Sequence, residues 1–130
     1  MATIIKLLSL QLALSLYLLG QGRSDDYECR GVPGEITIGQ AMTGKLVKGK
    51  PEWTVTFSNP CYCNQLHISV TCAGFKTVEK INPRALAIAG DGKCLLADDG
   101  AIHPHDSFSF NYAWDRPYPF KIADAIVACS

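Results

Sequence analysis

The residues best suited to metal chemistry in this sequence form one short cluster, His103-Pro104-His105-Asp106. In an extended chain, residues two apart project to the same side, so both imidazoles would face one way. Asp98 or Asp99 would then approach as a third ligand. The alternative is a polar loop that leads into a strand. We favour the loop, and the sequence predicts neither a metal site nor a cofactor site.

Catalytic motifs are missing from the sequence. It contains no Gly-x-Ser-x-Gly elbow, no His-Glu-x-x-His pair and no phosphate-binding P-loop. Adjacent carboxylates such as Asp98 and Asp99 fall in turn-rich segments, where aspartates are usually solvated. The cysteines are better explained as disulfides, which leaves no thiol nucleophile. The sequence therefore predicts a protein that is not an enzyme.

All six cysteines lie after residue 22, and an even number in an exported chain is typical of disulfides, here three. Zinc knuckles need wider spacing than that of Cys61 and Cys63, which are two residues apart. Those two side chains would leave an extended chain on the same side, so we expect them to pair with different partners. Cys29 and Cys129 would attach the two ends to the body of the domain. The pairing stays open among Cys29, Cys61, Cys63, Cys72, Cys94 and Cys129.

An export signal precedes these cysteines. An apolar run occupies residues 7–19, and small residues follow it at Gly22 and Ser24. This order is typical of a secretory signal peptide, which predicts residues 1–22 as the signal, with cleavage after Gly22 or, as second choice, Ser24. The run is shorter than the ~20 apolar residues of a membrane span. We therefore expect residues 23–130 to be a single secreted domain that does not insert into the membrane.

The charge of the mature region is close to balanced. Removing Lys6 from the 12 Lys and Arg leaves 11 against 12 Asp and Glu, a net charge of −1. Nucleic acids and anionic membranes both attract clustered positive charge, so neither is expected as the main partner. The one basic cluster, Lys45, Lys48 and Lys50, is most simply a solvated loop, and the alternative is a role in docking a partner.

Period-two alternation of apolar and polar side chains dominates the mature region. It predicts strands over residues 53–58, 66–72 and 107–112, with less regular strands over 36–40 and 120–129. Asp91-Gly92 predicts a hairpin with both residues at positive φ, although residues 84–89 would also suit a helical turn. The fold expected is all-β, a small antiparallel β-sandwich or partly open barrel stapled by three disulfides.

Aromatic side chains and an arginine gather near the C-terminus, at Trp114, Arg116 and Tyr118. Residues 114–117 break the strand alternation and predict a loop or bulge. An exposed tryptophan beside an arginine is typical of a protein-binding hot spot, and it would also suit stacking on a sugar ring. The alternative is that Trp114 folds back over the core, where large aromatic side chains stabilise most.

Short motifs surround the cysteines in a fixed order. They are Asn59-Pro60-Cys61-Tyr62-Cys63, His67-Ile68-Ser69-Val70-Thr71-Cys72, Ile81-Asn82-Pro83-Arg84, Cys94-Leu95, Asp99-Gly100 and Ser107-Phe108-Ser109-Phe110-Asn111-Tyr112-Ala113, followed by Pro117-Tyr118 and Cys129. Each motif is weak alone. Together, with the six cysteines, they resemble a plant family of small secreted cysteine-rich proteins, the TAPETUM DETERMINANT type.

The resemblance implies a protein ligand rather than an enzyme. Founding members of the family bind the leucine-rich-repeat ectodomain of a receptor-like kinase and specify tapetal cell fate in the anther. We therefore expect an extracellular (apoplastic) ligand whose receptor-binding candidates are Trp114, Arg116 and Tyr118, with Arg84 second. The rival expectation is a carbohydrate-binding cell-wall protein in which Trp53, Trp114 and Tyr118 form a stacking face.

Overall fold

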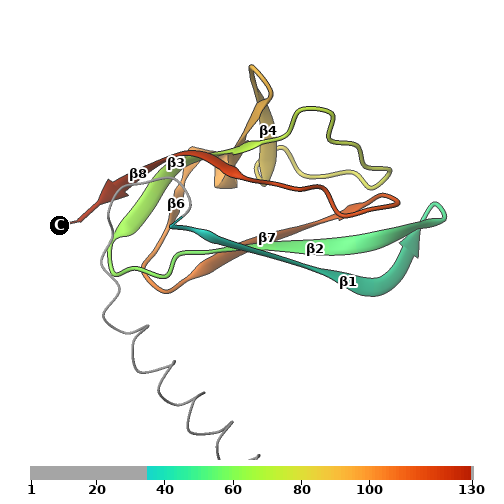
Figure 1. Ribbon diagram of the computed structural model, residues 1–130, viewed down its shortest axis with the longest axis horizontal. Helices are drawn as coiled ribbons and strands as arrows, with labels where there is room; N and C mark the ends of the chain where they lie inside the picture. The colour runs from blue at the N-terminus through green and yellow to red at the C-terminus, as the bar shows by residue number, and fades with distance from the viewer. Residues whose placement is uncertain (1–34, 130) are drawn as a thin grey trace, which may run out of the picture.

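Two antiparallel sheets make up the protein, as described by a computed structural model for residues 35–129 (Figure 1). The first sheet has the strand order β1-β2-β7, with β1 (Thr37–Val47), β2 (Lys50–Ser58) and β7 (Ser107–Ala113). The second contains β4 (Leu86–Gly90), β5 (Lys93–Leu96), β3 (Asn64–Thr71), β6 (Ala101–Ile102) and β8 (Ile122–Ala128). In this second sheet β3 is central, because it pairs with β5 and β6 on one side and with β8 on the other.

The core lies between the sheets and is built by alternating positions. On β2, Val55 and Phe57 are fully buried, whereas Thr56 between them and Thr54 before them are only half-buried. On β7, Phe110 and Tyr112 are buried while Ser109 and Asn111 are exposed. These side chains meet an aliphatic layer from the second sheet, which includes Ile68, Val70, Leu96 and Ile102. The all-β class and the period-two assignment of both strands are confirmed, and the sheets do not close into a barrel.

Along β3 the expected alternation is wrong at one point. His67 has a positive φ of 51°, and the pairing of β3 with β8 shifts register between Leu66 and Ser69. Such a bulge changes which side chains face inward. As a result Gln65 is buried, with 1% exposed, and Leu66, which was expected in the core, is only half-buried.

The β4–β5 hairpin is confirmed. Asp91 and Gly92 have φ values of 53° and 72°, and the residues on either side of them pair directly. The helical turn considered for this region is also present in part, but earlier than expected. Residues 83–85 form a turn in which the N–H groups of Ala85 and Leu86 donate to the Asn82 carbonyl, and the strand begins at Leu86.

Two disulfides hold β3 to its neighbours. Cys63–Cys129 joins the chain just before β3 to the residue after β8, and Cys72–Cys94 joins the residue after β3 to β5. Cys63 therefore pairs with a distant cysteine rather than with Cys61, and Cys129 attaches the end of β8 to the body, both as expected. Cys29, the predicted signal peptide and its cleavage sites lie outside the described residues, so the third disulfide stays a prediction.

The connection from β2 to β3 is fixed by one buried amide. Asn59 is 1% exposed, and its Nδ2 donates to the carbonyls of Cys63 (2.8 Å) and Ile102 (2.9 Å). Its Oδ1 accepts from the N–H of Cys61 at 3.2 Å. This side chain thus satisfies backbone groups where the chain passes from one sheet to the other.

Within residues 35–129, no helix has the length and apolar character required to cross a membrane.

We expect the double substitution Cys63→Ser/Cys129→Ser to lower the free energy of unfolding by about 2–5 kcal/mol. This bridge closes a separation of 66 residues, against 22 for Cys72–Cys94, and the longer loop restricts the unfolded chain more. The loss should therefore exceed that of Cys72→Ser/Cys94→Ser when both are measured by chemical denaturation. A larger loss for the shorter loop would show instead that packing around the buried Cys94 dominates.

Candidate functional site

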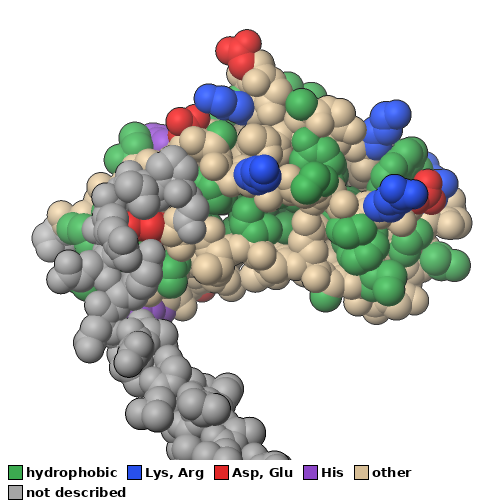
Figure 2. All heavy atoms as spheres, viewed as in Figure 1, with side chains coloured by type: hydrophobic (Ala, Val, Ile, Leu, Met, Phe, Trp, Pro, Cys, Tyr) green, Lys and Arg blue, Asp and Glu red, His purple; other side chains and the backbone are tan. Residues whose placement is uncertain are grey.

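The candidate residues lie on two connections. Trp114, Arg116 and Tyr118 belong to the connection of residues 114–121 between β7 and β8, and Arg84 belongs to residues 72–85 between β3 and β4. Both connections reach the end of the molecule that carries the β1–β2 turn (Figure 1). On the face seen in Figure 2, hydrophobic side chains gather at this end with basic and acidic side chains beside them.

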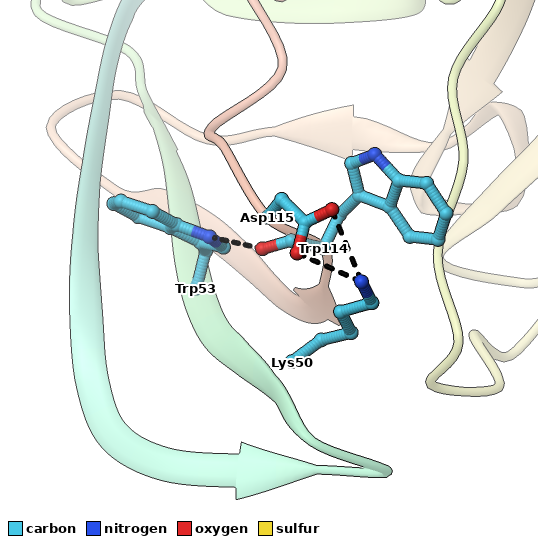
Figure 3. Close-up of polar contacts among 4 residues, drawn as sticks. All are labelled: Lys50, Trp53, Trp114 and Asp115. Carbon is cyan, nitrogen blue, oxygen red and sulfur yellow. Dashed lines mark hydrogen bonds and ion pairs between the residues drawn. The ribbon is translucent and has the colours of Figure 1, made fainter.

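Trp114 is held by groups from β2. Its N–H donates to the Pro51 carbonyl at 3.2 Å, and its own carbonyl accepts from the indole Nε1 of Trp53 at 3.1 Å. Lys50 Nζ lies 5.2 Å from the centre of the Trp114 ring, within reach of a cation–π interaction, and pairs with the Asp115 carboxylate at 2.9 Å (Figure 3). Trp114 is therefore partly buried beneath a lysine and is not among the side chains packed against the core.

Sequence reasoning missed the role of Lys50, which was interpreted only as part of a solvated basic cluster. The lysine and Asp115 are 65 residues apart, and no local pattern links them. The contact follows from the register of β2 with β7, which brings the start of β2 beside the residues that follow β7. The strand predicted here began at residue 53, so no signal in the sequence would have placed Lys50 beside Trp114.

The two arginines are the most accessible of the predicted residues. Arg116 and Arg84 are both exposed, and neither guanidinium forms an ion pair or hydrogen bond with any part of residues 35–129. The backbone that carries Arg84 is ordered by a local turn, in which the Arg84 N–H donates to Asn82 Oδ1 at 2.9 Å. Both positive charges are thus available to an acidic partner.

Tyr118 mainly serves the fold. Its ring packs edge-on against Phe75, with centroids 5.4 Å apart, and lies 4.7 Å from the Phe120 centroid. Its hydroxyl donates to the Ala73 carbonyl at 2.6 Å, which ties the two connections together. Trp53 also packs against the core. The three aromatic rings considered for sugar stacking therefore do not share one exposed face.

A buried tyrosine hydroxyl fixes the backbone of this connection. Tyr112 is fully buried, its hydroxyl donates to Gln40 Oε1, and it accepts from the Tyr118 N–H at 2.8 Å. Gln40 Nε2 completes the triangle by donating to the Tyr118 carbonyl at 2.6 Å. Burial raises the pKa of the Tyr112 hydroxyl, so it stays protonated and able to donate.

A second buried polar contact joins β2 to residues 72–85. Glu52 is only 5% exposed and accepts a hydrogen bond from the Thr43 hydroxyl at 2.8 Å. Burial raises the pKa of Glu79, and its hydrogen bond to Glu52 raises it further. The same hydrogen bond, followed by that from Thr43, lowers the pKa of Glu52. When the pair holds a proton, these opposite pKa shifts place it on Glu79 rather than on Glu52.

The histidine cluster does not assemble as a metal site. His103 Nδ1 lies 2.9 Å from Asn64 Oδ1, and Asp99 instead pairs with His67 at 3.0 Å. His105 has a φ of 58°, so the segment turns, and the extended geometry that would have aligned the two imidazoles is wrong. No group of three or more His, Cys, Asp or Glu within the described chain is arranged to hold a metal ion.

Replacing Tyr112 with Phe should lower the free energy of unfolding by about 1–3 kcal/mol, because Gln40 and the Tyr118 N–H lose a buried partner. Chemical denaturation measures this loss. The matched control is Tyr62→Phe, since Tyr62 is 55% exposed and should change stability by no more than about 0.5 kcal/mol. Equal effects of the two substitutions would contradict the role given to the Tyr112 hydroxyl.

Replacing Glu79 with Gln should change how stability depends on pH. The raised pKa of Glu79 means that its stabilising proton is fully present below the ordinary value of 4.5 and is lost as the pH rises through the raised value. Glutamine keeps a donor for Glu52 without titrating. The variant should therefore melt at a higher temperature than the wild type near pH ~8 and converge with it near pH ~4. A difference that stays constant over this range would contradict the shared proton.

Comparison with known proteins places the chain in a family. Residues 33–130 match the family model described as Tapetum determinant 1, C-terminal. TPD1 protein homolog 1 of Arabidopsis thaliana is 35% identical over 97 residues, which cover 73% of this chain and 53% of the relative. TPD1 protein homolog 1A of Oryza sativa subsp. japonica is 29% identical over 115 residues, which cover 82% of this chain and 50% of the relative.

The chain spans about half the length of these curated relatives. No solved structure matches it. The family model covers every described cysteine and both connections that carry the candidate residues. The resemblance seen in the motifs is confirmed, and the chain belongs to the Tapetum determinant 1 family.

Proposed function

We propose that this protein is a secreted signalling ligand that binds the leucine-rich-repeat ectodomain of a plant receptor-like kinase and acts in cell fate determination of the anther and tapetum type. The observation that carries the proposal is family membership over residues 33–130. The disulfides Cys63–Cys129 and Cys72–Cys94 support an oxidising, extracellular location. Residues 1–22 act as the export signal in this proposal.

The receptor-binding surface proposed here is the end of the molecule formed by Lys50, Trp114, Asp115 and Arg116. It combines an aromatic ring, an accessible arginine and one ion pair, and tryptophan and arginine are enriched among residues that dominate binding energy. Arg84, on the connection of residues 72–85, stays a second and separate candidate. Tyr118 supports the surface from behind through its contacts with Phe75 and Ala73.

A surface of this kind suits a ligand because it is ordered before it binds. The backbone N–H and the carbonyl of Trp114 both bond to residues of β2, and the side chain of Lys50 is held by the Asp115 carboxylate. Fewer side chains must then be immobilised on association, which lowers the entropic cost of binding. Solenoid ectodomains present an extended concave surface, into which the narrow end of a rigid domain can fit.

The proposal is tested by measuring the binding of the oxidised mature chain to a panel of leucine-rich-repeat ectodomains by surface plasmon resonance. Trp114→Ala and Arg116→Ala should each weaken binding by at least about tenfold, or about 1.4 kcal/mol. Ile88→Ala is the control, because Ile88 is 90% exposed on β4 outside the proposed surface.

Circular dichroism of each variant checks that the fold is retained. Arg116 has no described side-chain partner, so its removal leaves the fold intact and gives the cleaner measurement. Absence of binding to every ectodomain would overturn the receptor proposal. Binding that is unchanged in both variants would move the receptor contact away from this end of the molecule.

A further inference from the structure

β7 is an edge strand, and its hydrogen-bonding pattern with β2 shows which of its backbone groups point to the free edge. All its residues pair with β2, and antiparallel pairs alternate between hydrogen-bonded and non-hydrogen-bonded ones. The Trp114 N–H donates to the Pro51 carbonyl, so every second residue back along β7 from Trp114 directs its backbone to β2. Ser109, Asn111 and Ala113 therefore direct their N–H and carbonyl groups to the free edge.

Ala113 confirms this pattern, because its backbone N–H and carbonyl, which point away from β2, have partners in residues 72–85. Its N–H donates to Thr77 Oγ1 at 2.9 Å, and its carbonyl accepts from the Val78 N–H at 2.9 Å. The corresponding groups of Ser109 and Asn111 have no partner anywhere in residues 35–129. The segment around Val78 thus covers one end of the β7 edge and leaves the rest of that edge open.

The open edge also lacks the features that normally protect one. Natural edge strands carry lysines, prolines or inward-pointing charges that prevent pairing with another chain. Ser107–Ala113 contains no charged residue and no proline. The side chains of Ser109 and Asn111 turn back to β2, where they bond to Thr56 (2.9 Å) and Thr54 (2.7 Å) and leave the edge uncovered.

A groove of about 320 Å³ runs beside this edge. Ser109, Phe110 and Asn111 form one wall, and the opposite wall comes from the connection between β3 and β4, namely Glu79, Lys80, Ile81, Asn82 and Ala85. Ile81, Ala85 and Phe110 offer apolar contacts, and the other lining residues are polar or charged. The groove therefore combines free main-chain donors and acceptors with both apolar and polar side-chain contacts.

We propose that the groove binds an extended segment of a partner protein, which adds to the β1-β2-β7 sheet as a further strand. Main-chain hydrogen bonds to Ser109 and Asn111 supply the affinity in this mode of binding, and alternate side chains supply the specificity. The segment carries small apolar side chains at the positions facing Ile81 and Phe110 and uncharged polar ones between them. Val78, already bonded to Ala113, is the precedent for a strand at this edge.

A second copy of this chain fits the groove less well. Its β7 would enter with its own β2 and β1 attached, because all three belong to one sheet. The connection that carries Glu79 to Ala85 stands on the far side of the groove, where that sheet would have to lie. A single extended segment meets no such obstacle. The inference is independent of the receptor proposal, since the groove shares no residue with the proposed receptor-binding surface.

The test uses phage-displayed random linear peptides selected on the oxidised mature chain. Asn111→Pro removes the outward N–H but no bond to β2, and proline is tolerated at such edge positions. Asn111→Ala is the matched control, because it loses the same side-chain contact with Thr54 but keeps the N–H. Selected peptides should bind the wild type and Asn111→Ala alike and Asn111→Pro at least about tenfold more weakly.

Amide hydrogen exchange gives a second measurement that does not depend on the proline variant folding. In the free protein the amides of Ser109 and Asn111 should exchange faster than those of Phe110 and Tyr112, and a selected peptide should slow them. Failure to select any peptide, equal binding to Asn111→Pro, or no added protection would overturn the proposal. A dimer in analytical ultracentrifugation that Asn111→Pro abolishes would replace the peptide with a second copy.

Discussion

One phenolic hydroxyl orders the end of the molecule where the candidate residues lie. Tyr112 is fully buried, and its hydroxyl bonds at once to Gln40 of β1 and to the backbone of Tyr118. The first strand and the connection after β7, which are distant in sequence, therefore depend on a single polar atom inside an apolar core, where an unsatisfied group is costly. The path of residues 114–121 follows from this contact, and with it the placement of Trp114 and Arg116.

Buried polar contacts also order two other connections. Asn59 satisfies backbone groups around the start of β3, and the paired carboxyls of Glu52 and Glu79, with their opposite pKa shifts, link a strand to a long connection. Apolar side chains fill the core, but they tolerate many arrangements of similar volume. The buried polar contacts are directional, so they select one path for each connection and hold the surface residues in register.

The sequence predicted well what depends on neighbours along the chain. Alternation identified β2 and β7, and Asp91-Gly92 identified a hairpin, because strand faces and tight turns are set locally. It failed where a tertiary contact decides the outcome. The bulge at His67 turned Leu66 away from the core, where alternation had placed it. The contact of Lys50 with Trp114 arises only from the register of β2 with β7. Of the candidate site, residue types were predictable, but exposure was not: Tyr118 is committed to packing and the arginines remain accessible.

The position of the indoles has a spectroscopic consequence. The chain contains two tryptophans, and both lie at one end of the molecule, joined by the hydrogen bond from Trp53 to the Trp114 carbonyl. Intrinsic tryptophan emission of this protein therefore reports on that end alone, without a label. Lys50 stands over one ring, so reagents that couple through lysine amines would alter the fluorophore as well as the surface. Attachment by an engineered terminal tag would leave both undisturbed.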